Sequence, residues 1–212
     1  MLKKILVISA VVTAILAGLL SLAGVSPLSL PASIQTGTGM SAKLACSARH
    51  LSGLDADRIQ RDLASYGPAL EAVSIDYDEQ RGAARASLLG FSATARYRPG
   101  LGCSLDIGDT GRLDELTVPA LAPAAGPWPR GNEVTTARDD LQGRVAAMLD
   151  EDNAAGLETR ALLMAVDGTI AAEAYAPGFG PDTPLLGWSM GKTLTAVLLG
   201  HLEFIGRLDP QE

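Results

Sequence analysis

Three stretches within residues 73–107 alternate apolar and polar side chains: Val73-Ser74-Ile75-Asp76-Tyr77-Asp78, Phe91-Ser92-Ala93-Thr94-Ala95-Arg96-Tyr97-Arg98 and Cys103-Ser104-Leu105-Asp106-Ile107. A period of two residues is typical of a β-strand that buries one face. The alternation therefore predicts three or four antiparallel strands, with Cys103 on their apolar face.

A short helix is expected before these strands. Asp55 suits the N-cap, because its carboxylate can accept a hydrogen bond from the first turn. Arg58, Ile59 and Leu63 follow with helical spacing. Helix and strands together predict a small α+β module over residues 31–117.

The segment after this module breaks regular structure. Residues 118–135 contain Pro119, Pro123, Pro127 and Pro129 with Gly126, a composition that disfavours both helix and central strand. We expect a linker or a draped loop here.

Residues 136–212 begin a second region. A helix is expected over 136–149, and strands over 160–166 and 169–175 flank Asp167-Gly168, a pair that favours a type I′ hairpin turn. A last helix is expected from Ser189 to Gly206, with His201 packed on its apolar stripe. Because a helix and a hairpin cannot bury their faces alone, this region is expected to be an incomplete domain.

Composition limits the classes of function. The 212 residues allow one or two domains, and 47% hydrophobic residues indicate a folded protein. Lys and Arg number 17 against 24 Asp and Glu, a net charge of −7. Since no basic cluster is present, no nucleic-acid partner is expected.

The N-terminal residues predict export. After Lys3 and Lys4, the stretch Ile5–Val25 carries no charge and would span roughly 32 Å as a helix. Residues 1–30 are therefore expected to be a membrane anchor or a cleaved signal segment. The first alternative tethers the chain to the inner membrane with its bulk periplasmic or extracellular, and the second secretes it.

Two cysteines, Cys46 and Cys103, follow the export segment. An oxidising compartment favours a disulfide between them, and two buried free thiols are the alternative. Their spacing suits no metal site, and neither a metal nor a cofactor is expected.

The heptapeptide Gly187-Trp188-Ser189-Met190-Gly191-Lys192-Thr193 touches three motif families. A phosphate-binding loop needs four residues between its glycines, whereas Gly187 and Gly191 enclose three. The Gly-x-Ser-x-Gly nucleophile elbow of α/β-hydrolases fits by letters. However, it needs a buried strand before Ser189 and a later acid and histidine.

Ser-x-x-Lys is the third family, formed by Ser189 and Lys192. Positions i and i+3 share a helix face, so a lysine amine can take the proton of the serine hydroxyl. From residue 44 onward the chain uses thirteen arginines and only one lysine, Lys192. A base requires Lys because Arg does not deprotonate, although an arginine bias with one chance lysine is the alternative.

The order of helix, hairpin, Pro/Gly loop and Ser-x-x-Lys helix over residues 136–209 resembles a family of serine hydrolases. It is similar to the penicillin-binding protein and class C β-lactamase-like family, and the run 176–184 followed by 187–193 looks most like its 6-aminohexanoate-dimer hydrolase branch. The resemblance implies an acyl-enzyme formed on Ser189 from a small amide or ester, with Lys192 as base and the Ser189 backbone N–H as half of an oxyanion hole.

The family also uses a Tyr-x-Asn motif and a Lys-Thr-Gly-like strand after the serine, and neither follows Ser189 here. The resemblance therefore implies an incomplete catalytic domain with little or no turnover. The expected class is α+β: an N-terminal membrane or signal helix (1–30), a small module (31–117), a linker (118–135) and the truncated start of a β-lactamase-like α/β domain (136–212). A non-enzymatic envelope binding protein, a decayed enzyme and an α/β-hydrolase remain alternatives.

Overall fold

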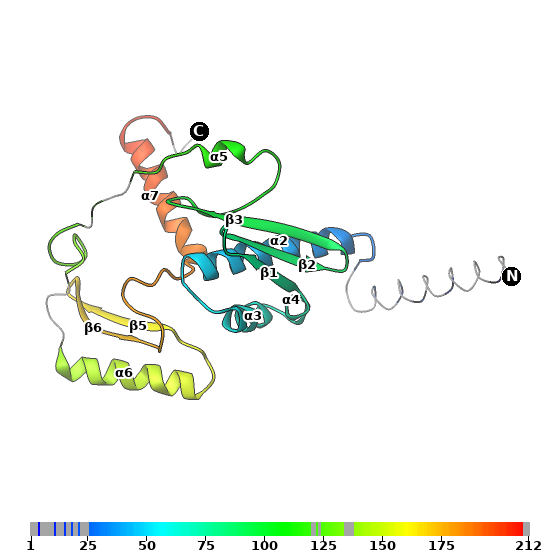
Figure 1. Cartoon of the computed structure of the whole chain (residues 1–212). Helices are drawn as coiled ribbons and strands as arrows, with labels where there is room; N and C mark the ends of the chain where they lie inside the picture. The colour runs from blue at the N-terminus through cyan, green and yellow to red at the C-terminus, as the bar shows by residue number, and fades with distance from the viewer. Residues whose placement is uncertain are drawn as a thin grey trace. The chain divides into compact units, whose positions relative to one another are not determined.

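The computed structural model describes residues 26–119, 122, 124–133 and 138–209, with isolated positions 4, 11, 15, 18 and 21 before them. The fold is mixed α+β (Figure 1). Two compact units divide the chain: Met1–Gly126 with Arg130–Asn132, and Pro127–Pro129 with Glu133–Glu212. The division falls inside the Pro-rich stretch for which a linker is predicted.

The first unit contains a four-stranded antiparallel sheet in the order β1-β2-β3-β4. Its elements are α2 (Leu30–His50), α3 (Ala56–Ser65), α4 (Pro68–Glu71), β1 (Ser74–Asp78), β2 (Ala83–Leu88), β3 (Phe91–Arg98), β4 (Gly102–Leu105) and α5 (Gly111–Asp114). The three strands predicted by alternation are confirmed. The fourth, β2, joins β3 through Leu89-Gly90, a two-residue turn with positive φ at both positions.

Helix α3 forms as its sequence predicts. Asp55 is the N-cap, and its carboxylate accepts a 2.8 Å hydrogen bond from the Arg58 backbone N–H. This bond lowers the pKa of Asp55, because it stabilises the charged carboxylate. Ile59 and Leu63 are buried and anchor the helix.

Helix α2 is the largest departure from the sequence-based expectation, which placed no helix between residues 31 and 50. It packs against β2, β3 and β4. Its buried residues are all small: Thr38, Gly39, Ser41, Ala42, Ala45, Cys46 and Ser47. The sheet also contributes small buried residues, among them Ala84, Ala86 and Ala95.

Small residues on both surfaces let α2 lie close to the sheet. The middle residues 36–39 of α2 are threonines and glycines, which are weak helix formers, and no stripe of large apolar residues marks it. Tertiary packing overrides both. Thr38 stays satisfied inside the contact because its hydroxyl donates to the Gln35 carbonyl at 3.0 Å.

A disulfide ties α2 to the sheet. Cys46 on α2 and Cys103 on β4 are bonded, with their Cα atoms 6.0 Å apart, and they are 57 positions apart in the sequence. The predicted pairing is confirmed. The bond crosses the contact between helix and sheet, where the buried residues of α2 are small.

The second unit holds α6 (Asp139–Ala154), β5 (Ala161–Val166), β6 (Thr169–Tyr175), the 3₁₀ turn η1 (Trp188–Met190) and α7 (Gly191–Phe204). Helix α6 packs on the β5–β6 hairpin. Its core is formed by Val145, Leu149, Ala172 and Ala174. Asp167 and Gly168 have φ values of 50° and 75°, so the hairpin turn is as predicted.

The predicted membrane or signal segment, Ile5–Val25, lies outside the described residues apart from four isolated positions. Within the part of the chain that the structure describes, none of the helices combines the length and apolar character needed to cross a bilayer.

Reducing the Cys46–Cys103 disulfide should destabilise the first unit by about 4 kcal/mol, because a loop of this length gains chain entropy when opened. Hydrogen exchange of β3 amides measures this, since both tryptophans belong to the second unit. The Cys46→Ser/Cys103→Ser variant should exchange fast with or without reductant. Unchanged exchange of the wild type after reduction contradicts the prediction.

Enlarging a small residue of α2 should separate the helix from the sheet. Ala45→Leu adds three carbons at a fully buried position and should cost about 1–3 kcal/mol through overpacking. Ala32→Leu, at an exposed position of the same helix, is the matched control and should be neutral. Equal stability of the two variants, measured by β3 hydrogen exchange, refutes close packing here.

Candidate active site

An irregular loop connects β6 to the Ser-x-x-Lys segment. Two short turns shape it: the Phe179 N–H donates to the Ala176 carbonyl at 3.0 Å, and the Thr183 N–H donates to the Gly180 carbonyl at 3.0 Å. The Thr183 hydroxyl accepts from the Gly180 N–H at 2.9 Å. The Pro/Gly-rich loop is therefore ordered by its own backbone bonds.

Ser189 lies in η1, the single 3₁₀ turn that opens α7. The Met190 N–H donates to the Gly187 carbonyl at 2.8 Å and closes this turn. Trp188, directly before the serine, has a φ of 40°, a conformation that is rare for a bulky residue. Strain of this kind is known to gather at functional sites.

The structure brings the two predicted catalytic residues together. Lys192 is the second residue of α7, and its Nζ donates a hydrogen bond to Ser189 Oγ at 3.0 Å. The separation lies within the range over which a general base acts. Both residues are exposed, so the pair is open to a substrate in solution.

The chemistry of a lysine base sets a condition on Lys192. An ammonium group has three donors and no acceptor, so Lys192 can take the serine proton only as a neutral amine. The start of α7 adds partial positive charge, which favours an oxyanion near Ser189.

The backbone before Ser189 disagrees with a nucleophile elbow. Residues 176–187 form no strand, whereas an elbow places its serine at the end of one. His201 is twelve residues further along the same helical segment, roughly 18 Å away, and cannot contact Ser189.

Tyr175 is the last tyrosine before the site and does not supply a second base. Burial, followed by a 2.7 Å hydrogen bond to Glu173, raises the pKa of Tyr175 to about 12. Its phenol is therefore protonated near neutral pH.

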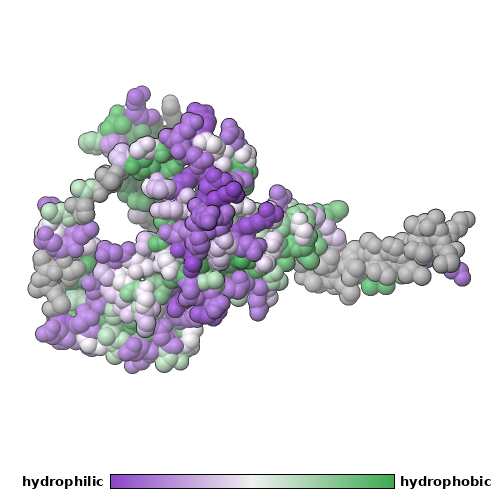
Figure 2. All heavy atoms as spheres, viewed as in Figure 1, coloured by the Kyte–Doolittle hydropathy of each residue, from purple (hydrophilic) through white to green (hydrophobic). Residues whose placement is uncertain are grey.

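Helix α7 lies exposed over its whole length, so the expected packing of its apolar stripe and of His201 is not found. Apolar surface is visible where Figure 1 draws α7 (Figure 2). An open hollow of about 600 Å³ lies at its start, lined by Gly187, Trp188, Met190, Gly191, Thr193 and Leu194. Neither Ser189 nor Lys192 lines this hollow.

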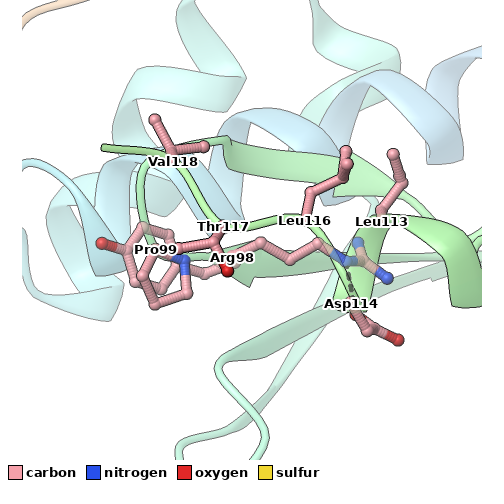
Figure 3. A pocket seen from close by; sticks show the side chains of 8 residues that line it. Arg98, Pro99, Leu113, Asp114, Leu116, Thr117 and Val118 are labelled. Atoms are coloured by element: carbon pink, nitrogen blue, oxygen red, sulfur yellow. Dashed lines mark hydrogen bonds and ion pairs between the residues drawn. The ribbon is translucent and has the colours of Figure 1, made fainter. Parts of the chain in front are cut away.

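A second cavity, of about 340 Å³, lies in the first unit (Figure 3). Its lining residues are Tyr97, Arg98, Pro99, Leu113, Asp114, Leu116, Thr117 and Val118. The sequence does not predict this cavity, because it forms where the loop after β4 folds back on the end of β3. No short sequence motif marks such a contact.

Two of the lining residues, Arg98 and Asp114, are charged, and the side chain of Arg98 is only 5% exposed. Its Nε donates to Asp114 at 2.6 Å (Figure 3). Its remaining nitrogens donate to Ser104 and Asp106. The bond to Asp114 is the main cause that raises the pKa of Arg98. Since its charge is matched within the protein, Arg98 fastens the loop rather than offering a free cation.

Within the described residues, no group of His, Cys, Asp and Glu side chains is placed to hold a metal ion. Comparison with known protein families, curated proteins and solved structures gives no match.

Asp114→Ala should loosen the loop over the Arg98 cavity. It removes a charge-assisted hydrogen bond from a buried guanidinium, a loss of about 1–3 kcal/mol, reduced from the value for a fully buried pair because Asp114 is half exposed. Hydrogen exchange of residues 106–118 measures the loss. Asp140→Ala removes a bond to the exposed Arg138 and is the matched control. Equal effects of both variants argue against an anchoring role for Arg98.

Proposed function

We propose that this chain carries the nucleophile segment of a serine hydrolase of the β-lactamase-related type. It would act on small amide or ester substrates through an acyl-enzyme. The observation that carries the proposal is the 3.0 Å hydrogen bond between Lys192 Nζ and Ser189 Oγ, set by i, i+3 spacing at the start of α7.

The order of elements adds support. Helix α6, the β5–β6 hairpin, the turn-rich loop and α7 occur in the sequence order of the family that residues 136–209 resemble. We also propose that residues 136–212 are the start of a β-lactamase-like domain.

In the proposed acylation, neutral Lys192 accepts the hydroxyl proton as Ser189 Oγ bonds to the substrate carbonyl carbon. The carbonyl oxygen becomes an oxyanion, for which the Ser189 backbone N–H and the helix N-terminus supply positive charge. The tetrahedral species then expels the amine or alcohol, which takes the proton from Lys192. In deacylation, water attacks the acyl carbon and gives a proton to neutral Lys192. Lys192 then returns the proton to Ser189 Oγ as the acid leaves.

The disulfide supports export as part of the proposal. A bond between Cys46 and Cys103 persists in an oxidising compartment, and is rare in the cytosol. We infer that the chain functions at or beyond the inner membrane, anchored or released through residues 1–30.

A fluorophosphonate probe should modify Ser189 of the 212-residue chain, because phosphonylation needs the activated serine but not later turnover. Peptide mapping by mass spectrometry locates the label, which Ser189→Ala should abolish. Ser74→Ala removes an exposed serine of β1 and should leave the labelling unchanged. Labelling of the Ser189→Ala variant at the wild-type rate would reject the proposal.

Lys192→Arg distinguishes a role of Lys192 as a base from a role as a positive charge, since Arg keeps the charge but does not deprotonate. Labelling of Ser189 should slow by about 10²–10⁴-fold, the usual contribution of a general base. Lys43→Arg is the matched control, because Lys43 also donates to a serine hydroxyl, that of Ser47 at 3.3 Å. A Lys192→Arg variant as reactive as the wild type favours a non-enzymatic protein.

A further inference from the structure

The chain after β4 folds over the end of β3 as a strap, residues 106–118, that is fixed at both ends. At its start, the Asp106 N–H donates to the Thr94 carbonyl at 2.9 Å. At its end, Val118 lies directly on Gly100, because a Cβ placed on Gly100 would come within 2.6 Å of Val118 Cβ. Movement of the strap is therefore confined to its middle.

Asp114 holds the middle of the strap to the sheet. Its Oδ1 accepts from Arg98 Nε at 2.6 Å, and its Oδ2 lies 3.9 Å from Arg96 Nη1. Among the described residues, the other hydrogen bonds of 107–117 stay inside the strap. Since the Asp114 side chain is 47% exposed, it can return to water when another anion takes its place.

Arg96 and Arg98 form a doubly positive site. They are two positions apart on β3 and so lie on the same face of the sheet. Asp106 pairs with both, 3.0 Å from Arg96 Nη2 and 3.5 Å from Arg98 Nη2. A second carboxylate is needed to balance the two guanidinium groups, and Asp114 supplies it from the strap.

The fit of Asp114 to this site is incomplete. Arg96 Nε is buried and finds no hydrogen-bond acceptor in the described part of the chain. Buried donors are normally paired, and 3.9 Å from Arg96 to Asp114 is too long for a hydrogen bond. A carboxylate that is not tied to the strap can approach Arg96 more closely than Asp114 does.

The cavity of about 340 Å³ lies directly beside this site, since Arg98 and Asp114 both line it (Figure 3). Ligand pockets in proteins begin at about 300 Å³, so this one suits a small molecule. The rest of its lining is largely apolar: Pro99, Leu113, Leu116 and Val118, with Tyr97 and Thr117. A charged site beside an apolar hollow suits a ligand that has a charged group on an apolar body.

We propose that Arg96 and Arg98 bind a small monocarboxylate with an apolar body, and that Asp114 occupies this site from within the chain when the ligand is absent. Arginine pairs well with a carboxylate because its planar donors match the two oxygens. All residues of this site belong to the first unit, so the inference does not depend on Ser189 and Lys192.

The exchange of one carboxylate for another keeps the buried Arg98 paired. A buried charge that loses its partner is costly, and a ligand without a negative charge would leave Arg98 in that state. In the exchange, Asp114 returns to water while the apolar body of the ligand leaves water for the cavity. The ligand thereby favours the strap conformation in which Asp114 is released.

Titration calorimetry of the full chain with benzoate tests the site. Benzamide has the same shape without the charge and is the matched control ligand. It should bind about tenfold or more weakly than benzoate, because it forms no charge-assisted bond with Arg98. Inorganic phosphate, which has no apolar body, should also bind more weakly than benzoate.

Asp114→Asn removes the competing charge and keeps the size of the side chain. It should tighten benzoate binding about tenfold or more, since the strap no longer competes for the site, and leave benzamide binding unchanged. Asp140→Asn is the matched control, because Asp140 is an exposed carboxylate paired with Arg138 at 2.8 Å. Ser189→Ala should bind benzoate like the wild type, which separates this site from the proposed active site.

Hydrogen exchange follows the strap directly. Benzoate should speed the exchange of residues 107–117 in the wild type, whereas the β3 amides should keep their rates, as they should in Asp114→Asn if that variant is folded. Equal benzoate affinity of the wild type and Asp114→Asn overturns the proposal, as does equal affinity for benzoate and benzamide or for benzoate and phosphate. So does the absence of benzoate binding to both proteins, its loss in Ser189→Ala, or a strap whose exchange benzoate leaves unchanged or slows.

Discussion

The close contact between α2 and the four-stranded sheet determines the structure of the first unit. Small residues such as Thr38, Ala42 and Ala45 meet buried alanines of β2 and β3, so backbone approaches backbone with few large side chains between them. Such a contact buries little apolar surface per residue and depends strongly on fit. The Cys46–Cys103 bond compensates by limiting the freedom of the unfolded chain at the same contact.

In the second unit, only some of the apolar surface is buried. Helix α6 covers the hairpin through Val145 and Leu149, whereas α7 keeps its apolar residues exposed. The η1 turn and the start of α7 position Ser189 and Lys192, whose side chains meet because they are three residues apart. The candidate chemistry is therefore local to one turn of the chain.

Local patterns predicted most of the elements. Alternation identified β1, β3 and β4, Asp55 marked the start of α3, and Asp167-Gly168 marked the hairpin turn, since each signal depends on neighbouring residues alone. Helix α2 and strand β2 were not predicted because their buried faces consist of small residues. Small residues give only a weak periodic signal in hydropathy. The Arg98 cavity escaped as well, since its loop and strand meet only after folding.

The sequence by itself determined the α+β class, the Cys46–Cys103 pair as a candidate bond, and the reach between Ser189 and Lys192, because strand period, residue chemistry and helical spacing act over short distances. Tertiary structure alone decided that a glycine- and threonine-rich segment becomes helix α2, that Arg98 is buried with its charge matched, and that α7 stays exposed. These outcomes depend on which surfaces meet. No single segment encodes that choice, since burial is a property of two surfaces together.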